Sequence, residues 1–155
     1  MKPKTRNRLL TALILLNLAF IWGNSAMTAE QSGGVSSSLL DWIKQFLPMF
    51  AGEAGHHLLR KLAHFSEFAC LGVLGAARMR SGGGTIRAPF FLVGLAPACV
   101  DETIQLYVPG RASSLLDVWL DAAGFAAGSL VLLLGCTIYE ICQHRMNTKI
   151  GGFPK

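Results

Sequence analysis

Charged residues are scarce in this chain. They make up 15% of its 155 residues, whereas hydrophobic residues make up 52%. Soluble domains carry about 25% charged residues, so this chain has few groups with which to keep a surface hydrated. The composition argues against a disordered chain, a small disulfide-rich secreted protein and a soluble enzyme with a small core. It indicates a membrane protein whose length fits one domain.

Motifs for metal binding and nucleophilic catalysis are also lacking. There is no HExxH pattern, and no nucleophile stands at a fixed spacing from a base. The cysteines lie in or beside apolar segments without metal-ligand spacing, which predicts small buried hydrophobic residues rather than disulfides. We therefore expect no metal and no cofactor from the motifs. The cysteines are Cys70, Cys99, Cys136 and Cys142.

Four apolar segments are separated by polar, Gly-rich or charged residues. A spanning helix needs about 20 mostly apolar residues. The second and fourth segments reach this length, while the first is short and the third is marginal. We predict an all-α integral membrane protein, a four-transmembrane-helix bundle preceded by a basic N-terminus at 1–8 and followed by a tail at 143–155. The helices are expected at about 9–23, 58–78, 86–106 and 115–142.

The first apolar segment has a second interpretation. A basic stretch, an apolar stretch and then Gly23-Asn24-Ser25 also resemble a signal peptide with a weak cleavage site. An anchored helix is the favoured reading. Under either reading, the segment that directly follows Trp22 lies on the outer side of the membrane.

The distribution of charge predicts the topology. With the N-terminus inside, most of the fourteen Lys and Arg residues fall on the inner side, and Glu140 is the one acid there. This asymmetry follows the positive-inside rule and places both termini in the cytoplasm. The net charge of +5 is thereby explained by topology, and we expect no nucleic-acid partner.

Between Gly23 and His57 lies an outer segment in which apolar residues recur at helical spacing from Leu39 to Phe50. It is too short to span, and Pro48 limits it further. We predict an interfacial or re-entrant amphipathic helix, with a simple cap over the outer end of the bundle as the alternative.

Polar residues gather on one face of each of the last three helices, toward the outer end. His64 and Asp101 lie at matching depths, roughly 21 Å from the inner ends of their helices. On the fourth predicted helix the polar face continues into Gly124 and Gly128, which permit close helix approach. The three faces are formed by Arg60, His64 and Glu67; by Asp101, Glu102 and Gln105; and by Ser114, Asp117, Asp121, Gly124 and Gly128.

These groups do not balance in charge. Arg60, Lys61 and Arg111 offset only part of the negative charge of the acids at 67, 101, 102, 117 and 121. The excess of about two negative charges calls for a protonated carboxyl group, a shared proton or a bound cation. The alternative is a purely structural network of interhelical salt bridges.

Three blocks carry the most specific sequence patterns. They are Asn24-Ser25 with the Ser-rich stretch at 32–38, RKLAHFSEF at 60–68, and DETIQLYVPGRASSLLDVWLDAAGFAAG at 101–128. Together they resemble the VanZ-like membrane proteins and assign residues 9–142 to one such domain. Phe68 departs from the family, which often has Tyr there.

The resemblance implies a bacterial plasma-membrane protein. The founding member gives low-level resistance to teicoplanin, a lipid-tailed glycopeptide that binds cell-wall precursors. No established catalytic mechanism comes with the family.

Our first hypothesis is a non-enzymatic protein whose outer polar pocket recognises an amphiphile. Its partners would be membrane lipids, a lipid-linked cell-wall precursor or a lipoglycopeptide, and it would contribute to glycopeptide resistance. Charged and polar side chains near the outer surface would hold the headgroup. The expected ligand-binding residues are Arg60, Lys61, His64, Gln105, Arg111, Ser114, Asp117 and Asp121.

The alternative is a membrane-embedded enzyme that modifies such a lipid. His64 would be its base or a metal ligand, and Glu67, Asp101, Glu102 or Asp121 would be the acid or further ligands. A proton relay through His64 and Glu67 is disfavoured, because the inner half of that helix offers no polar continuation.

Overall fold

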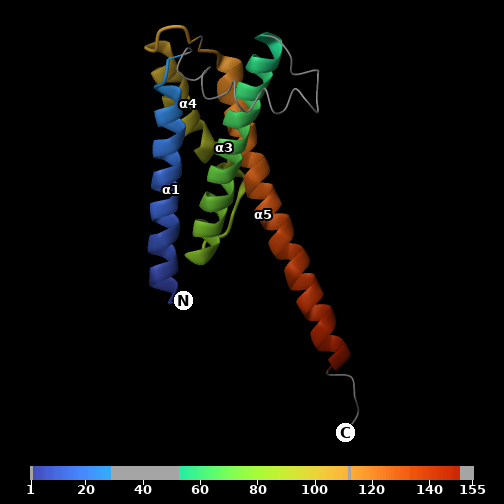
Figure 1. Cartoon of the computed structure of the whole chain (residues 1–155). Coiled ribbons are helices and arrows are strands. Elements are labelled where there is room, and N and C mark those ends of the chain that lie inside the picture. The colour runs from blue at the N-terminus through green and yellow to red at the C-terminus, as the bar shows by residue number, and fades with distance from the viewer. Residues whose placement is uncertain (1, 29–52, 112, 151–155) are drawn as a thin grey trace.

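The computed structural model describes residues 2–28, 53–111 and 113–150, and this part of the chain is all-α. The predicted amphipathic segment at 39–50 lies outside the described residues. Figure 1 shows helices packed along much of their length, with the end of α5 projecting beyond the others. The elements are α1 (Pro3–Ser25), α3 (Glu53–Ser81), the 3-10 helix η2 (Ala88–Gly94), α4 (Leu95–Leu106) and α5 (Leu115–Ile150).

Successive helices run in opposite directions (Figure 1). The chain ascends through α1, descends through α3, ascends again through η2 and α4, and descends through α5. The start of α1 and the end of α5 therefore lie at the same end of the molecule. The other end holds the C-terminus of α1, the first turns of α3 and α5, and the end of α4.

The third apolar segment differs from the single helix expected over 86–106. A seven-residue 3-10 helix comes first, and α4 has only 12 residues. Pro97 explains the division, since it has no N–H for the carbonyl of Val93 and its ring would clash with that carbonyl in a continuous α-helix. In the first turn of α4 the missing N–H costs nothing. Gly94 at the junction packs directly on Phe125, whose ring carbons would lie 2.6–2.8 Å from an added Cβ.

Small residues bring α3 and α5 into backbone contact. At Gly124 and Gly128, a Cβ atom would collide with the carbonyl oxygens of Phe65 and Ala69. Gly72 of α3 meets the backbone of Phe125 in the same way. The close approach expected for the glycine stripe therefore lies between α5 and α3.

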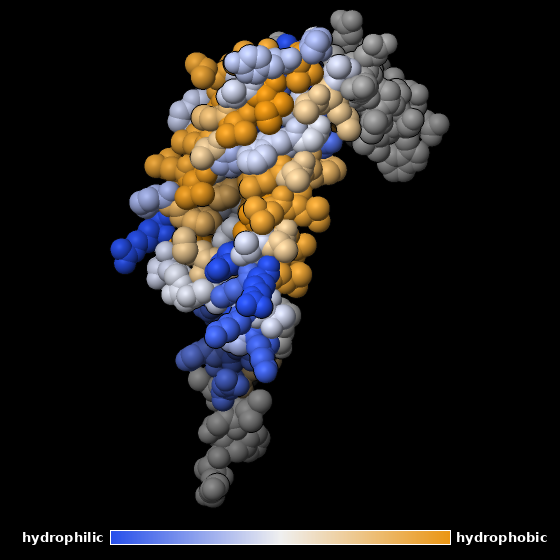
Figure 2. Space-filling view, turned by 90° about the vertical axis from the view of Figure 1, so that its left-hand side faces the viewer, coloured by the Kyte–Doolittle hydropathy of each residue, from blue (hydrophilic) through white to orange (hydrophobic). Residues whose placement is uncertain are grey.

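The outer surface of the helices is strongly apolar. Two helices, Pro3–Ser25 and Leu115–Asn147, are long and apolar enough to cross a membrane. Only 11% and 17% of their most apolar stretches are buried, whereas the core helix of a soluble protein would be mostly buried. Figure 2 shows broad hydrophobic areas on one face, with hydrophilic residues gathered toward the end at which α1 begins. These features indicate a membrane protein.

Candidate polar site

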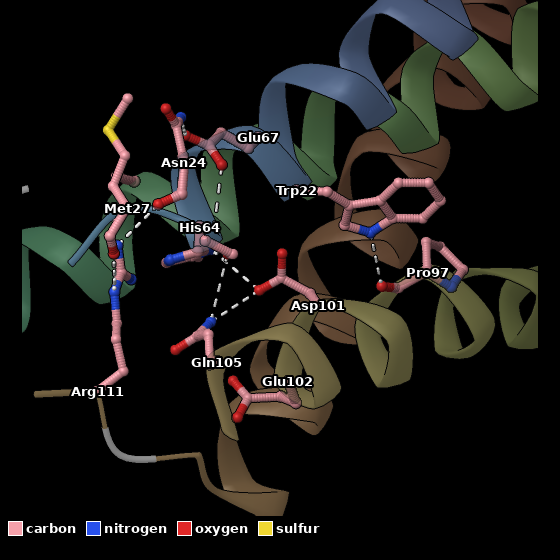
Figure 3. A network of polar contacts seen from close by, with 12 residues as sticks. Trp22, Asn24, Met27, His64, Glu67, Pro97, Asp101, Glu102, Gln105 and Arg111 are labelled. Carbon is pink, nitrogen blue, oxygen red and sulfur yellow. Dashed lines mark hydrogen bonds and ion pairs between the residues drawn. The ribbon is translucent and has the colours of Figure 1, made fainter. Parts of the chain in front are cut away.

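Buried polar side chains cluster at the end of the molecule where α1 ends and α5 begins (Figure 3). Asp101 and Asp121 are 0% and 1% exposed, and Glu102 and Gln105 are also buried. Burying an ionisable group costs free energy unless it is paired or hydrogen-bonded. The partners of each group therefore decide what the cluster does. We call His64, Glu67, Asp101, Gln105 and Asp121 the polar site.

Three helices bring His64, Asp101 and Asp121 together. Each offers one ligand atom, and these three atoms lie within 4.8 Å of one another. The Nδ1 atom of His64 is 3.7 Å from Oδ2 of Asp101 and 4.0 Å from Oε2 of Glu67. These distances exceed a hydrogen bond but allow strong electrostatic interaction. His64 and Asp101, which the sequence placed at matching depths, thus also lie close together in space.

Gln105 orients Asp101. Its Nε2 donates to Oδ2 of Asp101 at 2.8 Å, one helical turn along α4, and lies 3.5 Å from the Ser25 hydroxyl oxygen of α1. The side chains of Gln105 and Asp101 are both buried, so the hydrogen bond between them forms away from water. One carboxylate oxygen of Asp101 is thereby held in place.

Asn24, at the end of α1, contributes the partner of Glu67. Its Nδ2 donates to Oε1 of Glu67 at 2.9 Å (Figure 3). Asn24 and Ser25 were not among the predicted site residues, although both stand in the first of the three sequence blocks. That block was the one feature of the sequence that could have pointed to them, because the apolar segment around them shows no polar face.

Among the described residues, Arg111 binds backbone carbonyls and no carboxylate, contrary to the charge balance that the sequence suggested. Its Nη2 donates to the carbonyl of Asn24 at 2.7 Å, and its Nε donates to that of Met27 at 3.0 Å. The last carbonyls of a helix lack intrahelical donors, so the end of α1 attracts a guanidinium group. Burial and the nearby Arg60 lower the pKa of Arg111, yet a guanidinium remains charged in proteins.

The remaining charged residues surround the polar site; Glu102 is buried and the others are partly exposed. Lys61 forms an ion pair of 2.6 Å with Asp117, and both are partly exposed. Glu102 accepts a hydrogen bond of 2.8 Å from the backbone N–H of Ser114, and the Ser114 hydroxyl accepts one from Leu116. Glu102 and Ser114 thus cap the start of α5. Arg60 is half-buried on α3, one turn before the polar site.

Several buried polar atoms around the site have no hydrogen-bond partner among the described residues. Such atoms are uncommon in folded proteins, and each calls for a physical reason. Their concentration here contrasts with the saturated contacts of Ser129, which donates to backbone carbonyls of Gly72 and Phe125. The atoms are Nδ1 of His64, Oε2 of Glu67, Oδ1 of Asp101, Oδ1 of Asp121 and Nη1 of Arg111.

An apolar groove adjoins the polar site. It has a volume of about 380 Å³. Trp22 and Val100 in its wall lie within two residues of Asn24 and Asp101, so the groove and the polar site involve neighbouring residues of α1 and α4. The Trp22 Nε1 donates to the carbonyl of Pro97 at 3.3 Å, which ties α1 to α4 along it. Its lining includes Ile14, Leu18, Trp22, Val93, Pro97 and Val100.

The fold and the site together define a small helical membrane protein with a buried polar cluster at one end. The sequence model of the VanZ/LLP1 family matches residues 9–137. The chain therefore belongs to the VanZ/LLP1 family, which confirms the resemblance seen in its three sequence blocks. No curated protein and no solved structure matches the chain in comparable searches.

Proposed function

We propose that this protein binds an amphiphile in the outer leaflet of the bacterial plasma membrane, with the headgroup at the polar site and the hydrocarbon chain in the apolar groove. The observation that carries the proposal is that residues of the groove and of the polar site neighbour one another along α1 and α4, as Val100 and Asp101 do. A volume of about 380 Å³ lies within the range of ligand pockets. The amphiphile classes that fit are a lipid, a lipid-linked cell-wall precursor and a lipoglycopeptide.

The proposed topology has four passes and cytoplasmic termini. The 29 residues of α3 extend about 43 Å, and η2 with α4 would extend about 32 Å if collinear, against a hydrocarbon thickness of about 30 Å. The alternating helix directions and the basic start of α1 support this arrangement. Green fluorescent protein fused to either terminus should fluoresce, while alkaline phosphatase fused there should be inactive. Active phosphatase at either terminus would contradict this topology.

The headgroup contacts follow from the charges at the rim. The Lys61 side chain is 46% exposed and shares its charge with Asp117, so its ammonium can also meet a phosphate or carboxylate. Arg111 keeps its positive charge while its guanidinium is fixed by two backbone carbonyls. A fixed cation attracts an anionic headgroup without losing side-chain freedom on binding.

A contribution to teicoplanin resistance is the phenotype that such binding would produce. Teicoplanin has a lipid tail that the apolar groove could hold and a polar body that the polar site could bind. Binding either the drug or the precursor that it targets would reduce the number of drug–precursor complexes.

The test uses purified full-length protein in nanodiscs containing an anionic lipid. Native mass spectrometry would measure the retained lipid, and teicoplanin susceptibility would be measured in a bacterial host expressing the chain. Lys61→Gln should weaken lipid retention and resistance, because it removes the exposed cation at the rim. Arg87→Gln removes the same charge from an exposed residue outside the site and should change neither. Equal behaviour of the two variants would contradict the proposal.

A membrane-embedded enzyme is the second candidate, and the convergence of His64, Asp101 and Asp121 favours it. His64 would act as a base or metal ligand toward a lipid-linked substrate. Purified protein should then convert a labelled lipid precursor, and His64→Ala should abolish the conversion. Lipid binding without conversion would leave recognition as the function.

A further inference from the structure

We propose that His64, Asp101 and Asp121 form a binding site for one divalent transition-metal ion. Neither the motifs of the sequence nor the family assigns such a site. The proposal does not depend on amphiphile binding, because it concerns an ion held by the protein's own side chains. It is carried by the geometry of the three donor groups and by their uncompensated burial.

The distances suit shared coordination. Bonds of about 2.0–2.2 Å from one metal to His64 Nδ1 and Asp101 Oδ2, which lie 3.7 Å apart, would meet at about 120°. The three ligand atoms lie within 4.8 Å of one another, whereas two such bonds that meet at the tetrahedral angle span about 3.4 Å. Side-chain shifts of up to about 1.4 Å are therefore needed on binding.

Unpartnered buried oxygens supply an independent observation. Asp101 and Asp121 are almost fully buried, and Oδ1 of each has no hydrogen-bond partner in the described part of the chain. Within that part, two of the nearby bases have other partners: Lys61 pairs with Asp117, and Arg111 binds backbone carbonyls. Apart from His64, whose Nδ1 lies 3.7 Å from Asp101, neither buried carboxylate has a basic partner among these residues, and such a pair calls for a cation.

The surroundings also resemble those of known metal sites. Gln105 fixes one oxygen of Asp101 by a hydrogen bond, as outer-shell groups do for metal ligands. Because the three ligands come from α3, α4 and α5, the site exists only in the folded protein. Metal binding should consequently stabilise the fold.

The donor set selects the class of metal. One imidazole nitrogen with two carboxylate oxygens suits Zn²⁺, Mn²⁺ or Fe²⁺, whereas Ca²⁺ prefers about 6–8 oxygens. Three protein ligands leave at least one coordination position for an exchangeable group. A lipid phosphate or a water molecule has the oxygen that this position would accept.

The experiment uses full-length protein carrying a tag without histidines, purified in detergent, stripped with EDTA and dialysed. Zn²⁺ or Mn²⁺ is then added, the bound metal is counted by mass spectrometry, and the Tm is followed. We expect about one equivalent of metal and a higher Tm, since a ligand that binds only the folded state stabilises it. Absence of retained metal would overturn the proposal and would favour a proton shared by the two carboxylates.

Two variants make the test specific. Asp121→Asn should weaken metal affinity by at least about tenfold, because it removes a ligand. Asp117→Asn makes the same chemical change one turn earlier on α5, where the carboxylate pairs with Lys61, and should change affinity less than about twofold. Equal losses in both variants, or none in Asp121→Asn, would overturn the site.

A further control covers the case in which a variant fails to fold. If Asp121→Asn does not fold, His64→Gln takes its place, and EDTA treatment of the unmodified protein must still lower its Tm. Lipid retention measured on the EDTA-treated protein distinguishes this proposal from amphiphile binding, since Lys61 and the groove remain intact. If added Zn²⁺ or Mn²⁺ is not retained while lipid retention still depends on Lys61, only the metal-site proposal is overturned.

Discussion

Gly128 of α5 lies directly against the backbone of Ala69 in α3, so a Cβ atom at Gly128 would overlap the Ala69 carbonyl oxygen. This contact holds the two helices at backbone distance. It lies one turn beyond Gly124, which meets Phe65 in the same manner, and two turns beyond Asp121. The separation of α3 and α5 at these glycines therefore governs how closely His64 and Asp121 approach.

Gly128→Ala should destabilise the protein. The added methyl group meets backbone that cannot rotate away, and overpacking of this kind costs about 1–3 kcal/mol. Thermal unfolding in detergent would measure the change. Gly135→Ala on the same helix is the control, because no atom lies within 4 Å of its added Cβ, and Ala favours a helix over Gly by up to about 1 kcal/mol. Equal Tm values for the two variants would contradict the packing.

Gln105→Met should lower stability by about 1–3 kcal/mol, because it leaves a buried oxygen of Asp101 without its donor. Gln143→Met is a matched substitution at a site where the amide donates to an exposed Tyr139 hydroxyl, and its effect should stay within about 0.5 kcal/mol. Unfolding midpoints of the two variants give the comparison. A larger effect at Gln143 would show that the contact to Asp101 contributes little.

Arg111→Gln should loosen the end of α1. The substitution shortens the side chain and removes the charge that binds the carbonyls of Asn24 and Met27. Hydrogen–deuterium exchange of the backbone amides in the last turn of α1 should accelerate. Arg87→Gln, at an exposed residue, should leave that exchange unchanged. Unaltered exchange in Arg111→Gln would mean that α1 ends stably without the guanidinium group.

The Lys61–Asp117 ion pair should contribute a modest coupling energy. Both side chains are partly exposed, so we expect about 0.2–1 kcal/mol, decreasing as salt is added. A double-mutant cycle with Lys61→Ala and Asp117→Ala measures this value. Additive effects of the two substitutions would show that the close contact has no energetic consequence.

Much of the helical framework follows from local patterns. The apolar segments predicted helices near all four α-helices, and the stripe from Ser114 to Gly128 marked the face of α5 that packs inward. The third segment was mispredicted as one helix, because hydropathy does not register that Pro97 lacks an N–H for Val93. The partner of Arg111 was also missed, since charge counting favours carboxylates and overlooks the free carbonyls at the end of α1.

The sequence by itself determined the class of protein, the family, and the faces on which polar residues lie, because each depends on composition or on the helical repeat. Only the tertiary structure decided that His64, Asp101 and Asp121 meet within 4.8 Å and that Asn24 joins Glu67. Helical periodicity sets the direction of a side chain about its own axis. The distance between side chains on different helices depends instead on how those helices pack, here through the backbone contact between α3 and α5 at Gly124 and Gly128.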